Sequence, residues 1–252
     1  MSHKAPKQRL DTLVLNLGLA TSEAQARSLI MTGQVLVDDH PATKAGAQVA
    51  QSAPIRLKNS HKSRQWASRG GDKLVAGLDH FKLDPTGMIG LDIGASTGGF
   101  TDLLLQRGAT KVYAVDVGHG QLAWRLLQDE RVINLERTNA KDLTPALIGD
   151  PIDILVSDVS FISLTKALPA PLALLKSGGV GVVLVKPQFE VPREVEMTGG
   201  VVRDPQLQQA CVARITVWLQ EQGYAVHGHT PSPIKGPKGN QEYLLYFSKP
   251  HT

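Results

Sequence analysis

The stretch IGLDIGASTGGF, residues 89–100, decides the expected fold. It has the pattern of a buried strand, a glycine-rich loop and the start of a helix. Glycines let backbone amides approach a ligand closely, and a helix N-terminus adds the positive end of its dipole. The loop departs from the pattern G-x-G-x-x-G, because Ser96 holds the second glycine position. The stretch predicts a nucleotide-type ligand, although glycines that only permit a tight turn are a second interpretation.

Two carboxylates narrow the ligand. Asp116 ends the next apolar run, where a carboxylate can hold both ribose hydroxyls of an adenosine, a feature shared with NAD-binding proteins. Asp92 would repel a pyrophosphate but would suit the amino group of S-adenosylmethionine. We therefore expect S-adenosylmethionine as the cofactor, with NAD as the alternative. The loop 139–142 follows the third strand and is expected near the adenine, although it could equally be an ordinary loop. The residues expected at the cofactor are Asp92, Gly94, Ala95, Ser96, Thr97, Gly98, Gly99, Phe100, Asp116, Val117, Asn139, Asp142 and Asp158.

Strand and helix patterns alternate from Lys73 onward, which indicates an α/β fold with a parallel, doubly wound sheet. After a long helix with Asp204 as its cap and Pro205 in its first turn, two extended stretches, 224–230 and 242–247, can form a closing antiparallel hairpin. The expected strands cover 89–93, 112–117, 132–135, 154–156 and 180–185, and the expected helices between them cover 100–106, 121–128 and 164–176.

The front of the chain differs from the rest. Apolar spacing predicts helices over 10–17 and 24–30, followed by short strands near 35–37 and 55–57. This module is too small to be a free-standing enzyme. We expect a small α+β domain over residues 1–59, a polar and basic linker over 60–69, and the large α/β domain over 70–252.

Charge and composition limit the possible functions. Residues 1–73 carry 11 Lys and Arg against 5 Asp and Glu, whereas the remainder carries 16 against 18. A basic front suits a polyanion such as RNA, although it could also be an ordinary solvated surface. No apolar run approaches a membrane span, and no secretory signal is visible. The single cysteine, Cys211, excludes an internal disulfide and a multi-cysteine metal site. We expect a cytoplasmic protein without a metal.

Asp158 and Lys186 each end an apolar strand, so both should reach the crevice beyond the carboxyl ends of the sheet. A desolvated lysine could serve as a base in methyl transfer, and a simple buried ion pair is the alternative. Asp158 continues as Val159-Ser160-Phe161, which lacks the Asn/Asp-Pro-Pro-aromatic turn of many amino-group methyltransferases. Carbon methylation of pyrimidines needs a cysteine nucleophile in the site. Cys211 lies on an apolar helical face and is expected in the core, which argues against that reaction.

Five motifs resemble the TlyA, or hemolysin A, family of rRNA cytidine 2′-O-methyltransferases, which is related to the FtsJ-type RNA methyltransferases. They are SRGGDKL (68–74), the loop 92–100, SDVSF (157–161), VKPQFE (185–190) and GGVVRDP (199–205). The resemblance implies a Rossmann-like class I methyltransferase domain with an N-terminal RNA-binding domain of the ribosomal protein S4 type. It also implies S-adenosylmethionine as cofactor and ribosomal RNA or ribosomal subunits as partner. The catalytic tetrad that it implies is Lys73, Asp158, Lys186 and Glu242.

In this interpretation Lys186 is the base, Asp158 and Lys73 position it, and Glu242 holds a lysine or the ribose. A non-catalytic RNA-binding ribosome-assembly factor with a vestigial fold is one alternative, and a dinucleotide-dependent oxidoreductase fused to an RNA module is another. The sequence leaves open whether the protein is a monomer or a homodimer. The residues expected to contact RNA phosphates are Arg9, Arg27, Lys44, Arg56, Lys58, Arg64 and Arg69.

Overall fold

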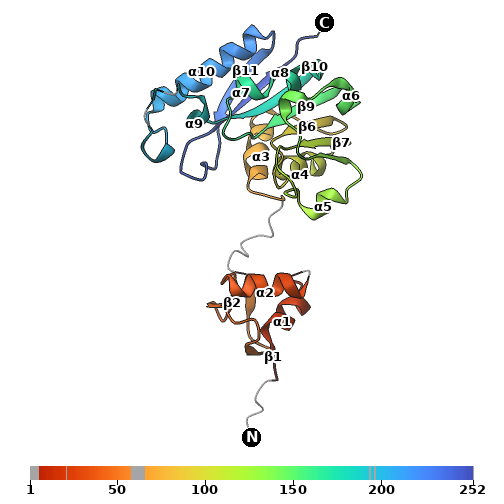
Figure 1. Ribbon diagram of the computed structural model, residues 1–252, viewed down its shortest axis with the longest axis vertical. Coiled ribbons are helices and arrows are strands. Elements are labelled where there is room, and N and C mark those ends of the chain that lie inside the picture. Colours follow the sequence, from red (N-terminus) through yellow and green to blue (C-terminus); the bar gives the residue numbers. More distant parts are fainter. Residues whose placement is uncertain (1–5, 21, 58–65, 193, 196, 252) are drawn as a thin grey trace. The chain divides into compact units, whose positions relative to one another are not determined.

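The chain folds into two compact units that divide between Gln65 and Trp66 (Figure 1). Each unit has its own core. Residues 66–69, which we expected in the linker, therefore lie in the second unit. The computed structural model describes residues 6–20, 22–57, 66–192, 194–195 and 197–251.

The first unit packs two short helices onto small antiparallel sheets, as the apolar spacing indicated. Leu10, Val14 and Ile30 are fully buried in its core. The turn between two of its strands places Asp38 and Asp39 in the left-handed region, at φ 48° and 65°, as a two-residue hairpin loop requires. Its elements are β1 (Lys7–Arg9), α1 (Leu10–Asn16), α2 (Glu23–Met31), β2 (Val35–Val37), β3 (His40–Ala42), β4 (Gln48–Ala50) and β5 (Ile55–Leu57).

The second unit is built on a seven-stranded sheet in the order β11-β12-β10-β9-β6-β7-β8. The five strands from β10 to β8 are parallel, and β12 and β11 are antiparallel. This is the expected mostly parallel sheet with a final antiparallel hairpin. The strands are β6 (Ile89–Ile93), β7 (Lys111–Val115), β8 (Val132–Leu135), β9 (Ile152–Ser157), β10 (Leu175–Val185), β11 (Ala225–Pro231) and β12 (Tyr243–Ser248).

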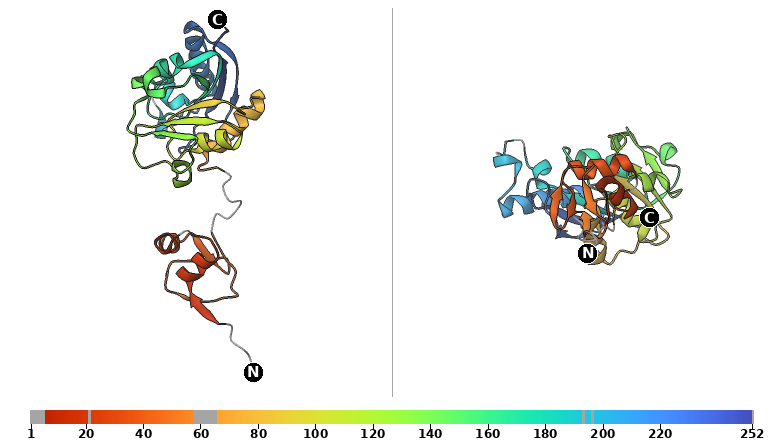
Figure 2. Two further views of the ribbon diagram at one scale, coloured as in Figure 1. Left: turned by 90° about the vertical axis from the view of Figure 1, so that its right-hand side faces the viewer. Right: turned by 90° about the horizontal axis from the view of Figure 1, so that it is seen from below.

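Helices cover both faces of this sheet, giving three layers that Figure 2 shows from two further directions. Alternation along the strands fills both interfaces. Val182 and Leu184 pack with α3 and α4, whereas Val183 and Val185 pack with α7, α8 and α10. The helical segments are α3 (Gly70–Phe81), α4 (Gly99–Gln106), α5 (Trp124–Leu127), η1 (Ala140–Asp142), α6 (Pro145–Ile148), α7 (Leu164–Ala167), α8 (Pro169–Ala173), α9 (Pro187–Glu190), η2 (Thr198–Gly200) and α10 (Pro205–Glu221).

Two expected helices are wrong in extent. The helix expected over 121–128 is only α5, because Ala123 N donates to Thr97 O and the Gln121 side chain accepts from Ser96 Oγ. These residues are fastened to the glycine loop instead of continuing the helix. The helix expected over 164–176 divides into α7 and α8 at Pro169, which has no N–H to donate, and Leu175 already begins β10.

The C-terminal elements follow expectation. Asp204 caps α10 by accepting from Gln206 N at 2.8 Å, and Pro205 occupies its first turn. Cys211 is 3% exposed within the core, as predicted. Among the described residues, no helix is long and apolar enough to cross a membrane. Because β12 runs antiparallel beside β10, its start at Tyr243 lies level with Val185, where β10 ends.

Candidate active site

The carboxyl edge of the sheet gathers the polar residues that the sequence placed at strand ends. In register, Ile93 of β6 lies beside Val115 of β7 and Ser157 of β9. Asp116 and Asp158 follow those two strands directly, and Lys186 follows β10. Glu242 precedes the antiparallel β12 and so reaches the same edge. An open parallel sheet binds ligands at this edge.

The glycine loop between β6 and α4 is shaped by positive φ angles at Gly94 (83°), Ser96 (49°) and Gly98 (91°). A Cβ on Gly94 would lie 3.1 Å from Asp158 O, so the loop runs directly against the segment that follows β9. Asp158 N also donates to Ile93 O at 3.1 Å. Ser96 and Thr97 are exposed at the tip, whereas the Phe100 side chain is buried in the core. The loop thus joins the predicted cofactor residues to Asp158.

Asp92 is fully buried beneath this loop. Its Oδ2 accepts hydrogen bonds from Thr101 N at 2.9 Å and Thr101 Oγ1 at 2.7 Å. Its Oδ1 has no partner among the described residues. Burial raises the pKa of Asp92 to about 7, and the two Thr101 hydrogen bonds oppose that shift. An unpaired buried carboxylate oxygen is costly for the fold and is suited to a cationic ligand.

Asp116 holds the neighbouring loops in place through its two carboxylate oxygens. Oδ2 accepts from Ser96 N at 2.8 Å, and Oδ1 accepts from Gly118 N at 2.7 Å. Val117, directly after it, is 70% exposed, which leaves an apolar side chain open beside the carboxylate. Thr138 N donates to Asp116 O at 3.0 Å, which brings the loop 139–142 alongside.

Within that loop, Asn139 caps η1 by accepting a hydrogen bond from Lys141 N at 3.1 Å. Asp142 is exposed at the end of the same short helix. The structure therefore brings the residues expected around an adenosine to one part of the carboxyl edge. Their role in binding stays a prediction.

Lys73, Asp158, Lys186 and Glu242 form one chain of charged side chains. Glu242 Oε2 lies 2.7 Å from Lys73 Nζ, and Lys73 Nζ lies 3.7 Å from Asp158 Oδ2. Asp158 Oδ1 lies 2.6 Å from Lys186 Nζ, which also donates to Ser160 Oγ at 2.8 Å. The exposed side-chain fraction is 1% for Glu242, 8% for Lys186, 11% for Lys73 and 21% for Asp158. Two lysines and two carboxylates thus alternate in a nearly closed site.

The comparisons with known proteins address this arrangement. A sequence model of FtsJ-like methyltransferases matches residues 66–249, and a model of the S4 domain matches residues 8–55. The 16S/23S rRNA (cytidine-2′-O)-methyltransferase TlyA of Mycobacterium tuberculosis is 46% identical over 96% of this chain and 90% of its own. Hemolysin A of Brachyspira hyodysenteriae is 40% identical over 95% of this chain and 99% of its own. The chain belongs to the TlyA family of FtsJ-like methyltransferases.

The fold of this FtsJ-like methyltransferase is also similar to a solved structure. A protein from Streptococcus thermophilus described as a hemolysin shares 40% identity, covers 98% of this chain and 90% of its own, and superposes with a TM-score of 0.74. Membership of a methyltransferase family favours methyl transfer over the hydride transfer of a dinucleotide-dependent oxidoreductase. The expected S4-type domain at the N-terminal end and the expected α/β fold are confirmed.

Sequence reasoning missed several side chains around the tetrad of this methyltransferase. Gln188 Nε2 donates to Glu242 Oε1 at 3.2 Å. Phe161 is 91% exposed with a φ of 65°, and its ring lies 5.2 Å from that of Phe189 at an angle of 49°. A positive φ at a non-glycine residue with an exposed aromatic ring can mark a functional site, but it is visible only in the structure. The sequence showed Phe161 only as part of the motif SDVSF.

Residues 66–71 hold the first turn of α3 against α4. Trp66 is 7% exposed and lies so close to Gly71 that a Cβ there would meet its ring at 2.4 Å. Ala67 N donates to Asp102 Oδ2 at 2.6 Å in α4, and Arg125 pairs with the same carboxylate. This packing sets the position of the first turn of α3, from which Lys73 reaches Asp158 and Glu242.

The residues predicted to contact RNA are exposed where they are described, and three of them have acidic partners. Arg9 pairs with Asp11, Arg27 pairs with Glu23, and Arg56 pairs with Asp39. Lys44 and Arg69 are also exposed. Lys58 and Arg64 lie outside the described residues. The RNA-contact assignment stays a prediction.

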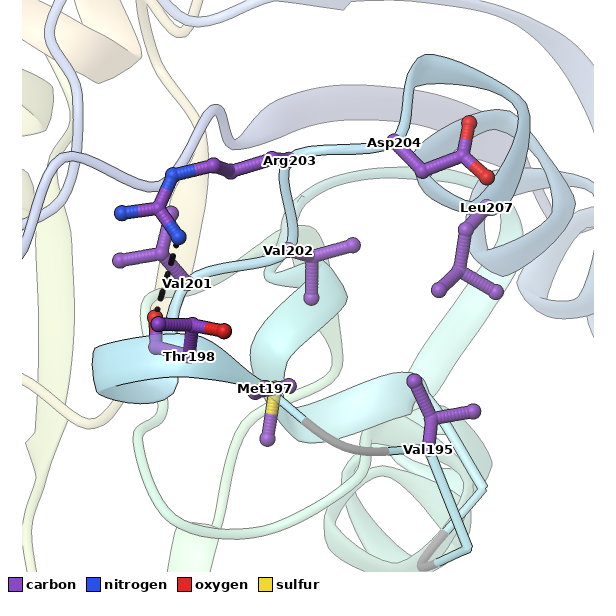
Figure 3. A pocket seen from close by; sticks show the side chains of 8 residues that line it. All are labelled: Val195, Met197, Thr198, Val201, Val202, Arg203, Asp204 and Leu207. Carbon is purple, nitrogen blue, oxygen red and sulfur yellow. Dashed lines mark hydrogen bonds between the residues drawn. The ribbon is translucent and has the colours of Figure 1, made fainter.

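A hollow of about 230 Å³ lies outside the tetrad and the glycine loop (Figure 3). Arg203 at its rim donates to Thr198 O at 3.2 Å. Among the described residues, no group of three or more His, Cys, Asp or Glu side chains could hold a metal ion. None of the predicted site residues lines the hollow, whose lining residues are Val195, Met197, Thr198, Val201, Val202, Arg203, Asp204 and Leu207.

Proposed function

We propose that this protein transfers a methyl group from S-adenosylmethionine to the ribose 2′-hydroxyl of cytidine in ribosomal RNA, in one or both ribosomal subunits. The observation that carries the proposal is the chain Glu242–Lys73–Asp158–Lys186 beside the glycine loop. The activity named for the Mycobacterium tuberculosis relative supports the choice of cytidine and of the 2′-oxygen.

The described residues fit S-adenosylmethionine. The unpaired Oδ1 of Asp92 would receive its amino group, and Gly94 lets the loop run close against the segment that carries Asp158. Asp116 would hold the ribose hydroxyls, and Val117 would contact the adenine. When bound, the cofactor supplies an electrophilic methyl group on a sulfonium, which is already a good leaving group. The protein's task is then to place the nucleophile and remove its proton.

Lys186 is the proposed proton acceptor. As the 2′-hydroxyl becomes the nucleophile for the methyl group that the cofactor would supply, its proton would pass to the neutral form of Lys186 Nζ. Asp158 and Ser160, at 2.6 and 2.8 Å, orient that nitrogen. Lys73 shares the Asp158 carboxylate and is held by Glu242, so two lysines divide one negative charge. Because Asp158 also pairs with Lys73, it stabilises the cationic form of Lys186 less than it would as the partner of Lys186 alone.

The first unit is proposed to bring the enzyme to its substrate. An S4 domain and a net charge of +5 over residues 1–65 support binding to ribosomal RNA or to ribosomal subunits. A substrate of this kind supports a cytoplasmic location.

The test is methyl incorporation from labelled S-adenosylmethionine into ribosomal subunits. Lys186→Met should lower the rate by about 100-fold or more, because general-base catalysis typically contributes about 10²–10⁴-fold. Lys166→Met, an equal change at an exposed lysine on α7, should leave the rate within about twofold. Mapping 2′-O-methyls in rRNA with and without the gene identifies the cytidine. A Lys186→Met variant with the wild-type rate, or a methyl group found on a base, would refute the proposal, and a folded protein without any transfer would favour an RNA-binding assembly factor.

A further inference from the structure

Two neighbouring segments meet at Lys186. One follows β9 and brings Asp158 and Ser160, and the other is α9, which begins directly after Lys186. Helix α7, which ends the first segment, and helix α9 have four residues each. Helices this short have little stability of their own, because nucleation is costly and few hydrogen bonds repay it. Their geometry must therefore be fixed by contacts with other parts of the protein.

Glu190, the last residue of α9, makes these contacts. Its Oε1 accepts from Leu164 N at 2.8 Å, and its Oε2 accepts from Ser163 Oγ at 2.7 Å. Both donors lie at the start of α7, where backbone N–H groups lack helical partners. Arg214 of α10 pairs with the same Oε2. One carboxylate thus joins α7, α9 and α10.

We propose that Glu190 is a positioning residue for methyl transfer, which holds the loop after Asp158 and the loop after Lys186 in the register that the reaction needs. This inference rests on the proposed function. The contacts that depend on this register are Ser160 Oγ to Lys186 Nζ at 2.8 Å, Gln188 Nε2 to Glu242 Oε1 at 3.2 Å, and the paired rings of Phe161 and Phe189.

The cost of the arrangement supports a purpose beyond packing. Glu190 is 2% exposed, and burial raises its pKa although its hydrogen bonds and Arg214 oppose the shift. If packing were its only purpose, an ion pair such as Glu190–Arg214 could be replaced by apolar side chains of similar volume with little loss of stability. A carboxylate gives something that apolar side chains do not, because its two oxygens accept from fixed directions and set the relative position of both loops.

The experiment compares Glu190→Gln and Arg214→Met with the matched control Glu221→Gln, a carboxylate-to-amide change at an exposed position in the last turn of α10. An amide has one acceptor oxygen, so Glu190→Gln cannot serve Leu164, Ser163 and Arg214 together. We expect kcat on ribosomal subunits to fall by about 10–100-fold, as a displacement of about 1 Å at a reacting group can do. The KM for S-adenosylmethionine should stay within about twofold, because the predicted cofactor residues other than Asp158 lie on other loops.

Arg214→Lys keeps the positive charge and should retain activity within about threefold of wild type, whereas Arg214→Met should not. Arg214 has 48% of its side chain exposed, so both variants should fold even if Glu190→Gln does not. Circular dichroism gives the folded fraction to which every kcat is normalised. A purely structural Glu190 would lower the melting temperature and leave the normalised kcat unchanged, which overturns the inference. If wild-type protein itself transfers no methyl group to rRNA, it is the proposed function that has failed.

Discussion

At the scale of single residues, Asp92 shows most clearly a conflict between stability and function. The carboxyl is buried beneath the glycine loop with one oxygen unpaired. Its pKa of about 7 lies above the ordinary value of 3.8, so the folded state holds the proton more tightly than the unfolded chain. That difference corresponds to a free energy on the order of 4 kcal/mol against folding at pH values above 7. Such a position is explained by a cationic ligand better than by packing.

The Asp92→Asn variant should therefore be more stable than wild type, by a margin that grows with pH. As pH rises from about 4 to 7, the unfolded chain of the wild type ionises before the folded protein does, and stability is lost. An amide at position 92 does not ionise, and its oxygen can still accept both Thr101 hydrogen bonds. Urea unfolding at pH 5 and pH 8 measures the difference. A margin that is negative, or equal at the two pH values, would contradict this account.

The same carboxyl predicts the pH dependence of cofactor binding. The amino group of S-adenosylmethionine is cationic and should bind the ionised form of Asp92, so affinity should rise between pH 5.5 and pH 7.5, up to about tenfold for each pH unit below the pKa. Asp92→Asn should bind weakly with little pH dependence. Calorimetric titration of both proteins at several pH values is the measurement. Parallel pH dependences in the two proteins would place the amino group elsewhere.

Lys73 and Glu242 mark the limit of what sequence patterns reveal at this scale. Asp158 and Lys186 could be placed at the carboxyl edge because each ends an apolar strand. Lys73 lies in the first turn of a helix, and its 2.7 Å contact spans 169 residues to Glu242. That contact exists only because β12 inserts beside β10, which no local pattern specifies. The family resemblance supplied both residues, and their catalytic role stays a prediction.

At the scale of elements, most strands were predictable and the four-residue helices were not. Strand β6 matches its expected range and α4 differs by one residue, because alternating apolar residues and a glycine loop fix them locally. The four-residue helices α5, α7 and α9 depend on contacts from other elements. For α5 those contacts come from the glycine loop, and for α7 and α9 they come from Glu190.

The loop between β6 and α4 gives a prediction at this scale. Gly94→Ala should lower S-adenosylmethionine affinity by about tenfold or more, because alanine is strained at a φ of 83° and its Cβ would press on Asp158 O at 3.1 Å. Gly223→Ala is the matched control, with a φ of 87° and nothing within 4 Å of the added Cβ. Both variants should lose the stability that the strained φ costs, with a larger loss for Gly94→Ala, and only Gly94→Ala should lose affinity in calorimetry. Equal affinities in the two variants would show that the loop tolerates this change.

At the scale of the whole molecule, the proposed function divides RNA binding and methyl transfer between the two units. The net charge of +5 over residues 1–65 contrasts with −1 over the rest, and the tetrad and glycine loop lie in the second unit. Composition predicted this division, because charge summed over a segment does not depend on tertiary contacts. The individual RNA contacts were less predictable, since the acidic partner of Arg56, Asp39, lies 17 residues away and becomes evident only in the structure.

This division predicts how RNA affinity responds to salt. Lys44 is exposed, and Lys44→Gln should weaken binding to ribosomal RNA and reduce the slope of log affinity against log salt by about 0.7–0.9, the value for one phosphate contact. The rate at saturating RNA should not change, because the tetrad is untouched. Lys82→Gln removes the same charge at the C-terminal end of α3, opposite the turn that carries Lys73, and should leave the slope unchanged. Filter binding from about 50 to 300 mM salt measures both variants. If Lys82→Gln reduces the slope as much as Lys44→Gln does, the RNA surface extends over the second unit, and the basic charge of the first unit is not what selects the polyanion.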